Sequence, residues 1–112
     1  MLKSGDICQA ELGPPFGSEA GFKRPVVIVT AQKILSHQPQ VVHVVPLTTT
    51  IRNYTTEVTL EPDPENLLTS ISAAQCQHIR AISSARIGAT NGNIGEVALS
   101  QIRELIGLIL DT

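Results

Sequence analysis

The sequence predicts a small, mainly β (α+β) protein, built as a strongly bent antiparallel β-barrel with a C-terminal helix. Short segments rich in β-branched residues recur along the chain, with turn residues between them, which indicates about five or six short strands. The last segment instead repeats apolar residues at helical spacing. A chain of 112 residues with 42% hydrophobic residues has the size of one globular domain, so we expect a single domain over residues 1–112.

The first half of the chain alternates strands with connections of different length. In the opening strand, Ile7 lies on one face and Cys8, Ala10 and Leu12 on the other. The expected elements are a strand over 6–12, a Gly/Pro-rich loop to residue 23, a strand covered on both faces over 24–31, a connection with one helical turn over 32–40, and a strand over 41–47.

The second half ends in the clearest periodic pattern. The strand over 55–61 should be half-exposed, with Glu57, Thr59 and Glu61 on the outer face. We expect next a turn over 61–64, a helical turn over 65–68, closely packed strands in the small-residue segment 70–82, a loop over 83–93, and a helix over 95–110. That helix should bury an apolar stripe of Val97, Leu99, Ile102, Leu105, Ile106 and Ile109.

Composition limits the functions that the chain can carry. The formal net charge is −2, which disfavours a protein that coats nucleic acid along its length. Any site for a polyanion must be a local cluster of basic residues. Cys8 and Cys76 are too few for a metal cluster and are expected to be buried thiols. The sequence shows neither a signal peptide nor the roughly 20 apolar residues of a membrane span, so we expect a cytoplasmic protein.

A cationic pair stands where the long loop enters its strand. Lys23 and Arg24 precede Pro25, which fixes the backbone, and a guanidinium held at a strand mouth suits a phosphate. The alternative is a solvated basic pair before an edge strand. Thr48, Thr49 and Thr50 likewise place three hydroxyls at the end of another strand, although β-propensity and turn bonding explain them equally well.

Several motifs, taken in their order along the chain, resemble one protein family. They are GDI at 5–7, GPPFGSEAGFKRP at 13–25, VVIVT at 26–30, VVPLTT at 44–49, EVTL at 57–60, and HIRAI at 78–82 followed by Arg86. In this combination and over nearly the whole chain, the sequence resembles the MazF/PemK family of toxin endoribonucleases.

The resemblance implies a fold, an activity and two partners. It implies an SH3-like barrel, a homodimer, and cleavage of single-stranded messenger RNA at short sequences without a metal or other cofactor. It also implies a cognate antitoxin whose disordered tail occupies the RNA groove. The family's catalytic arginine falls on Arg24 and its catalytic threonine on Thr48.

The resemblance also implies the RNA-binding residues. The loop segment with Phe16, Gly17, Glu19 and Lys23 matches the part that closes over RNA. Further candidates for contacts with RNA, including unstacked bases, are Thr49, Asn53, Gln77 and His78. Many relatives have Glu-Gln where this chain has Gln77 and His78, so its base preference should differ.

The chemistry assigns roles to some of these residues. Attack by a ribose 2′-hydroxyl needs a proton acceptor, a donor for the leaving 5′-oxygen, and positive charge at the phosphate. Arg24 suits the charge and donor roles but not the base, because its guanidinium stays protonated. Thr48 suits a hydrogen bond to a phosphate oxygen. The base remains open between Glu19, His78 and water.

Two other functional classes compete with the nuclease. The same fold occurs in toxins that bind DNA gyrase and cut no RNA, and an SH3-like interaction module would use the long loop for protein contact. The pair Arg24 and Thr48 favours the nuclease.

Other residues receive simpler interpretations. His43 is expected in the core or an interface, and His37 and Arg52 in solvent. Arg80 and Arg86 are expected to contact RNA phosphates or surface acids.

Overall fold

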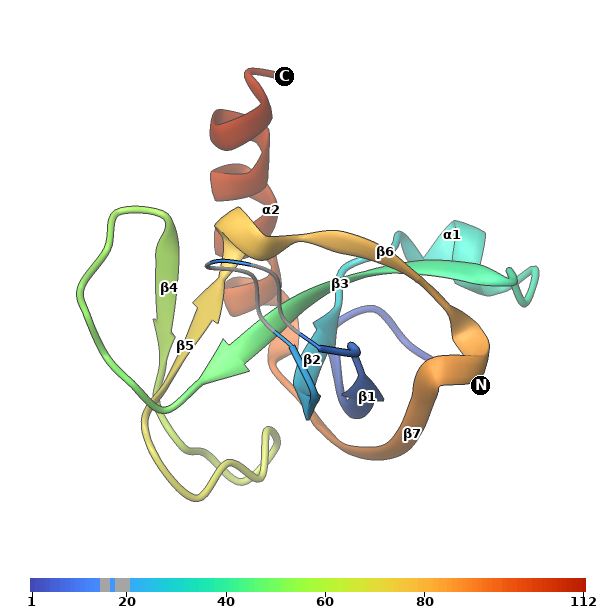
Figure 1. The fold of residues 1–112 in the computed structure, drawn as a ribbon, viewed down its shortest axis with the longest axis horizontal. Helices are drawn as coiled ribbons and strands as arrows, with labels where there is room; N and C mark the ends of the chain where they lie inside the picture. Colours follow the sequence, from blue (N-terminus) through green and yellow to red (C-terminus); the bar gives the residue numbers. More distant parts are fainter. Residues whose placement is uncertain (15–16, 18–20) are drawn as a thin grey trace.

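The computed structural model describes residues 1–14, 17 and 21–112, and within them it confirms a mainly β protein with a C-terminal helix (Figure 1). The strands are β1 (Asp6–Glu11), β2 (Lys23–Ile28), β3 (Val41–Thr48), β4 (Glu57–Leu60), β5 (Ser72–Gln75), β6 (Arg80–Ser83) and β7 (Ile87–Asn93). The helices are α1 (Gln32–Leu35) and α2 (Gly95–Leu110), with 3-10 turns η1 (Cys76–His78) and η2 (Ser84–Arg86).

The strands form one antiparallel sheet of order β4-β5-β3-β2-β1-β7. Strand β3 is the centre of this arrangement, since β2 pairs along one of its edges while β6 and then β5 pair along the other. The small-residue segment after residue 70 turns sharply at η1, which lets β5 and β6 both reach β3. The bend is the expected one, and the sheet is barrel-like without closing.

Side chains of the central strands are buried on both faces of the sheet. On one face Ile7, Val27 and Val45 pack under α2 together with Leu99 and Ile102. The opposite face carries a second core, made of Cys8, Ala10, Leu12, Val26, Ile28, Leu35, Val42, Val44 and Ile82. The alternation predicted for the first strand is therefore confirmed, and each core uses alternate residues of the same strands.

Helix α2 has the predicted bounds, and of the predicted stripe it buries Leu99 and Ile102 and partly buries Leu105, Ile106 and Ile109. Val97 is the exception, because it is 76% exposed near the helix start. Arg103 is exposed, and its Nη2 donates to the Val29 carbonyl oxygen at 3.2 Å and to Ser4 Oγ at 3.1 Å. The helix is thereby fastened to the end of β2 as well as packed on the sheet.

The loop predicted over 83–93 is wrong, because η2 and strand β7 occupy most of it. The segment GATNGN has no alternation of apolar and polar side chains, and most of it is exposed. It is held through its backbone, by antiparallel pairing with β1 in a register with two irregularities. Such an edge strand leaves little pattern in a sequence.

A buried asparagine organises the connection between β4 and β5. Asn66 is 3% exposed, and its side chain donates to the Glu61 carbonyl oxygen and accepts from the N–H groups of Asp63 and Leu68. The Asn93 N–H donates to the Glu65 carbonyl oxygen at 3.1 Å, which ties this connection to β7. The helical turn expected over 65–68 is a single turn at residues 64–66.

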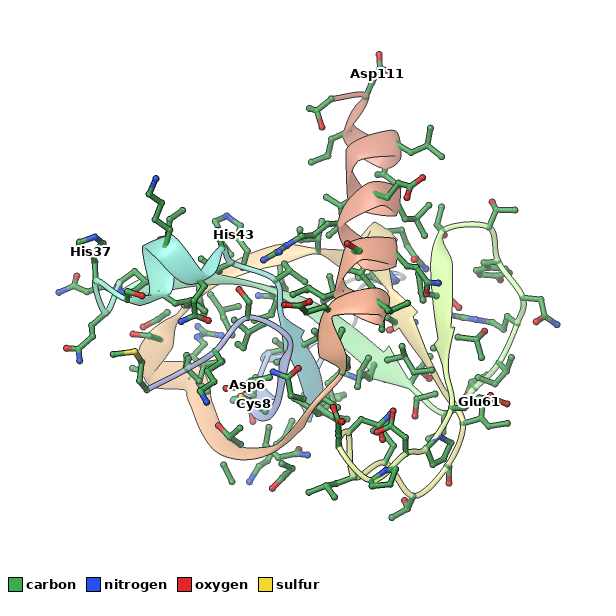
Figure 2. All side chains as sticks on the ribbon, turned by 180° about the vertical axis from the view of Figure 1, so that it is seen from behind. Asp6, Cys8, His37, His43, Glu61 and Asp111 are labelled. Carbon is green, nitrogen blue, oxygen red and sulfur yellow. The ribbon has the colours of Figure 1, made fainter. Side chains whose placement is uncertain are left out.

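The labelled histidines lie at the outside of the molecule (Figure 2). His37 is exposed, as predicted. His43 is exposed too, so its assignment to the core is wrong: it follows the alternation of β3 outward, between the buried Val42 and Val44.

Candidate functional site

The register of β2 and β3 places Arg24 and Thr48 at the same end of one sheet face. Val26 is paired directly with Pro46 in this antiparallel ladder. Arg24 lies two residues before Val26 and Thr48 two residues after Pro46, so both share the face of that pair and lie beyond the same end of it. Two residues far apart in the sequence thus come from neighbouring strands to one site.

The Arg24 side chain is available to a ligand. It is half-buried, and within the described ranges 1–14, 17 and 21–112 no hydrogen bond or ion pair engages its guanidinium. Its backbone is fixed, since Arg24 pairs with Ala10 of β1 and precedes Pro25. A positioned guanidinium with free donors suits the two-point contact that phosphate oxygens offer. The neighbouring Lys23 is exposed.

Thr48 has the geometry of a hydrogen-bond donor. Its Oγ1 accepts from the Thr50 N–H at 3.1 Å, and its backbone is paired with Ala73 of β5. Because that contact uses the oxygen only as an acceptor, the hydroxyl proton can be donated to a ligand. Thr49 follows in an exposed position.

Two arginines hold the base of the long loop. Arg80 Nη1 donates to the Leu12 carbonyl oxygen at 3.3 Å, and Arg86 Nη1 to the Glu11 carbonyl oxygen at 3.4 Å. Among the described residues neither arginine forms an ion pair with a surface acid, and their contact with RNA phosphates stays a prediction. Of the loop candidates, Gly17 is exposed with φ +63, while Phe16 and Glu19 lie outside the described residues.

Three polar side chains form a network beside Thr48. Glu57 Oε2 accepts from Arg52 Nη2 at 3.2 Å and from Gln77 Nε2 at 2.7 Å. Arg52 also stacks on Tyr54, with 4.7 Å from the guanidinium carbon to the ring centroid. Arg52 is exposed, as predicted, and in addition it is held by these two contacts.

The outward position predicted for Glu57 is wrong, since its side chain is only 3% exposed. The network joins the segment after Thr48 to η1, and so brings the Thr49–Asn53 segment and the Gln77–His78 segment to the same region. Asn53 is exposed with φ +57, and His78 is half-buried in η1. Sequence reasoning did not name Glu57 or Gln75 as site residues, because the contacts that bury them come from other parts of the chain.

Burial raises the pKa of both cysteine thiols. The pKa of Cys76 is raised to about 11, because the thiol is buried, and burial also raises that of Cys8. Both thiols are therefore protonated near neutral pH. The expectation of buried structural thiols is confirmed, and neither is suited to act as a nucleophile.

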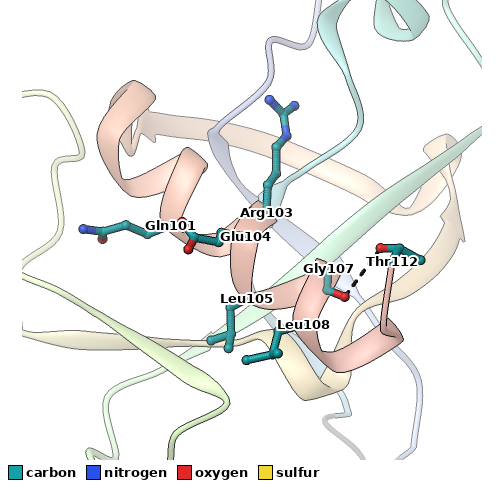
Figure 3. Close-up of a pocket in the computed structure, with 7 residues that line it drawn as sticks. All are labelled: Gln101, Arg103, Glu104, Leu105, Gly107, Leu108 and Thr112. Atoms are coloured by element: carbon teal, nitrogen blue, oxygen red, sulfur yellow. Dashed lines mark hydrogen bonds between the residues drawn. The ribbon is translucent and has the colours of Figure 1, made fainter.

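A cavity of about 810 Å³ lies along α2, away from the Arg24–Thr48 face. Figure 3 shows Leu105 and Leu108 projecting side by side at it, with Gln101, Arg103 and Glu104 along the helix. It holds neither Arg24 nor Thr48, so we do not assign it to the same chemistry. In the part of the chain that the structure describes, no helix is long and apolar enough to cross a membrane.

Comparison with known proteins shows which family the chain is similar to. A relative named endoribonuclease MazF9 of Mycobacterium tuberculosis (strain ATCC 25618 / H37Rv) is 32% identical over 116 residues, covering 99% of this chain and 98% of the relative. The solved structure of the M. tuberculosis toxin MazF-mt6 matches with a TM-score of 0.76 and 27% identity, over 95% of this chain and 96% of that one.

A mycobacterial endoribonuclease solved in complex with its cognate antitoxin has the same fold, with a TM-score of 0.78 and 21% identity over 99% of this chain and 96% of that one. The family model of PemK-like, MazF-like toxins of type II toxin–antitoxin systems matches residues 3–110. The chain therefore belongs to this family of toxins.

Proposed function

We propose that this toxin is a sequence-specific endoribonuclease that cleaves single-stranded messenger RNA by attack of a ribose 2′-hydroxyl, without a metal or other cofactor. The observation that carries the proposal is the β2–β3 register, which brings the Arg24 guanidinium, engaged by none of the described residues, and the Thr48 hydroxyl to one end of one sheet face. The relative that is 32% identical along its length is named an endoribonuclease, which supports the same reaction.

In the proposed reaction, Arg24 and Thr48 bind the scissile phosphate. The 2′-oxygen attacks phosphorus, the bond to the 5′-oxygen breaks, and the products are a 2′,3′-cyclic phosphate and a free 5′-hydroxyl. Arg24 stabilises the charge that develops on the phosphate oxygens and donates a proton to the leaving 5′-oxygen. Thr48 donates a hydrogen bond to a phosphate oxygen.

The proton acceptor for the 2′-hydroxyl is a separate role. Arg24 does not fill it, since its guanidinium stays protonated. His78, at the end of η1, and the loop residue Glu19 are the candidates from the protein, with water as the third. The pH dependence of the cleavage rate, measured for variants of His78 and of Glu19, separates these candidates. Only the variant that lacks the base should lose the fall in rate at low pH that protonation of the base causes.

We propose that the RNA path uses the segments on either side of this pair. It includes Phe16, Gly17, Glu19 and Lys23 from the loop, and Thr49, Asn53, Gln77 and His78 from the opposite side. We further infer a cytoplasmic toxin with one domain over residues 1–112, which acts as a homodimer and is neutralised by a cognate antitoxin. The relative solved with its own antitoxin supports that last inference.

The test is cleavage of a long single-stranded RNA by the purified protein in excess chelator, with both new ends mapped. Site-limited cuts with a 2′,3′-cyclic phosphate and a 5′-hydroxyl are expected from the natural chain. Arg24→Lys keeps the charge but loses the planar two-point contact, so we expect cleavage to fall at least about 100-fold, as for other contacts made to a developing oxyanion. Near-normal cleavage by this variant would remove Arg24 from its role.

The controls separate the nuclease from its alternatives. Lys33→Ala changes an exposed cation on α1 and should cleave normally. If the natural chain leaves RNA intact but inhibits growth on expression, a gyrase-binding toxin replaces the proposal. Intact RNA without growth inhibition favours an interaction module.

A further inference from the structure

Three buried oxygen atoms beside the proposed catalytic pair have no hydrogen-bond donor. They are Oε1 of Glu57, Oε1 of Gln75 and Oε1 of Gln77, and no donor among the described residues reaches them. Gln75 is 5% exposed and the Glu57 side chain 3%. A buried acceptor without a donor is destabilising, so such groups are rare and call for an explanation.

The three side chains lie in one place. Glu57 and Gln75 are direct cross-strand partners in the β4–β5 ladder, which puts their side chains next to each other on one face. The Gln77 carboxamide is in contact with Glu57, because its Nε2 donates to Glu57 Oε2 at 2.7 Å. Oε2 therefore has donors from Gln77 and Arg52, whereas no residue in the described ranges donates to Oε1 of the same carboxylate.

This cluster lies on the same sheet face as Arg24 and Thr48. Thr48 is paired with Ala73, and Gln75 follows Ala73 by two residues, so the Thr48 and Gln75 side chains point to one side. Glu57, as the partner of Gln75, is on that side too. On this face, strands β2 and β3 carry the proposed phosphate contacts Arg24 and Thr48. The neighbouring strands β5 and β4 carry Gln75 and Glu57, whose Oε1 atoms receive no donor from the described residues.

We propose that Glu57, Gln75 and Gln77 form a recognition site for an RNA base that carries an exocyclic amino group. This inference rests on the proposed endoribonuclease function. An amino group supplies N–H donors to the acceptors that Glu57, Gln75 and Gln77 leave unpaired among the described residues. A carboxylate oxygen is an acceptor in every orientation, whereas a carboxamide can present its NH2 group instead, so Glu57 is the most selective member of the cluster. Uracil offers one N–H between two carbonyl oxygens, and those oxygens would face further acceptors.

Access to the cluster is controlled by Arg52. Its side chain is 39% exposed, lies against Tyr54, and makes the solvent-side contact with Glu57. Only the arginine of this pair is exposed, so a donor that displaces Arg52 has to hydrogen-bond to the buried carboxylate in its place. A base amino group can do so, and the tyrosine ring beside Arg52 offers a surface on which the base can stack.

The test combines base analogues with protein variants. Once the natural chain's cleavage sequence is mapped, each guanine, adenine and cytosine in a short substrate is replaced in turn by hypoxanthine, purine or 2-pyrimidinone, which lack the amino group. At one position we expect kcat/KM of the natural chain to fall about 10- to 100-fold, because a charged acceptor then stays unpaired. For the Glu57→Gln variant, the same analogue should lower kcat/KM by less than about threefold, because the variant has already lost the contact with the amino group.

A second variant and a control protect the conclusion against a folding defect. Gln75→Leu keeps the size and burial of the side chain but removes the acceptor, and should show the same loss of response. Glu61→Gln removes an exposed carboxylate just past the end of β4 and should respond as the natural chain does. The readout is the ratio of kcat/KM for the natural substrate to kcat/KM for the analogue, measured on one protein. A partly unfolded fraction lowers both values equally and leaves their ratio unchanged.

The outcomes also separate this inference from the proposed function. Absence of cleavage by the natural chain would refute the nuclease itself. If the natural chain cleaves but tolerates every analogue, or if Glu57→Gln keeps the full response, the base-recognition site is refuted. The unpaired acceptors would then point to a cationic side chain of a protein partner.

Discussion

Gly92 is a position at which almost any side chain should damage the fold. Its φ of +119° is unfavourable for residues with a Cβ atom. A Cβ there would lie 2.5 Å from the Asn66 carbonyl oxygen, 2.8 Å from the Asn66 carbonyl carbon and 2.9 Å from the Glu65 carbonyl oxygen. All three are backbone atoms, so no side-chain rotation relieves the overlap.

The expected loss for Gly92→Ala follows from these contacts. A positive φ at alanine costs about 1–2 kcal/mol. Moving the backbone of Glu65 and Asn66 away also breaks the Asn93 N–H bond to Glu65, worth about 1 kcal/mol, and disturbs the buried Asn66 bonds, worth at least about 1 kcal/mol more. We expect a total of at least ~3 kcal/mol, which corresponds to roughly 12 °C in Tm for a chain of this length.

The assay is urea unfolding followed by circular dichroism, at one fixed protein concentration because association shifts apparent stability. Gly95→Ala is the matched control: its φ of +83° is also positive, but nothing lies within 4 Å of the added Cβ. It should lose only about 1–2 kcal/mol. If the two variants agree within about 0.5 kcal/mol, the overlap with Asn66 contributes nothing and the reasoning from contacts is refuted.

Three further predictions concern the core, the thiols and the site. Ile102→Ala empties a fully buried position between α2 and the sheet and should cost about 2–5 kcal/mol by urea unfolding, whereas Leu108→Ala, at a 75% exposed position, should stay within about 0.5 kcal/mol. Because burial raises the pKa of Cys76 from 9.0 to about 11, folding favours the protonated thiol. Stability should be complete below pH 9 and fall by up to about 1.4 kcal/mol per pH unit towards pH 11, and Cys76→Ala should flatten that slope. His78→Gln should change the mapped cleavage sequence more than the overall rate, and an unchanged map would assign His78 to structure.

Elements with a strong periodic pattern were predictable from the sequence. The bounds of α2 follow from apolar residues at helical spacing, and the two faces of β1 follow from alternation. Strand β7 left no such signal, because backbone pairing to β1 holds it while its side chains are mostly exposed. Its place in the sheet depends on a contact across more than 80 residues of sequence, between Cys8 and Thr90.

The candidate site was predictable in its parts but not in its connections. Arg24 and Thr48 were named from motifs, yet only the register of β2 with β3 shows that they share a face. Glu57 was placed outside because strand alternation does not reveal that Arg52 and Gln77 cover it. A local pattern predicts which way a side chain points, but what lies over it is decided by residues elsewhere in the chain.

The central position of β3 has a consequence for how the molecule opens. Because β3 is paired along both edges and Val42, Val44 and Val45 are fully buried, the amide protons of this central part should exchange with solvent only when the whole domain unfolds. Thr48 ends this slowest-exchanging segment, next to the paired Leu47. Local fraying of other segments would then leave Thr48 in place. Partly destabilised variants should therefore stay toxic until the whole domain unfolds.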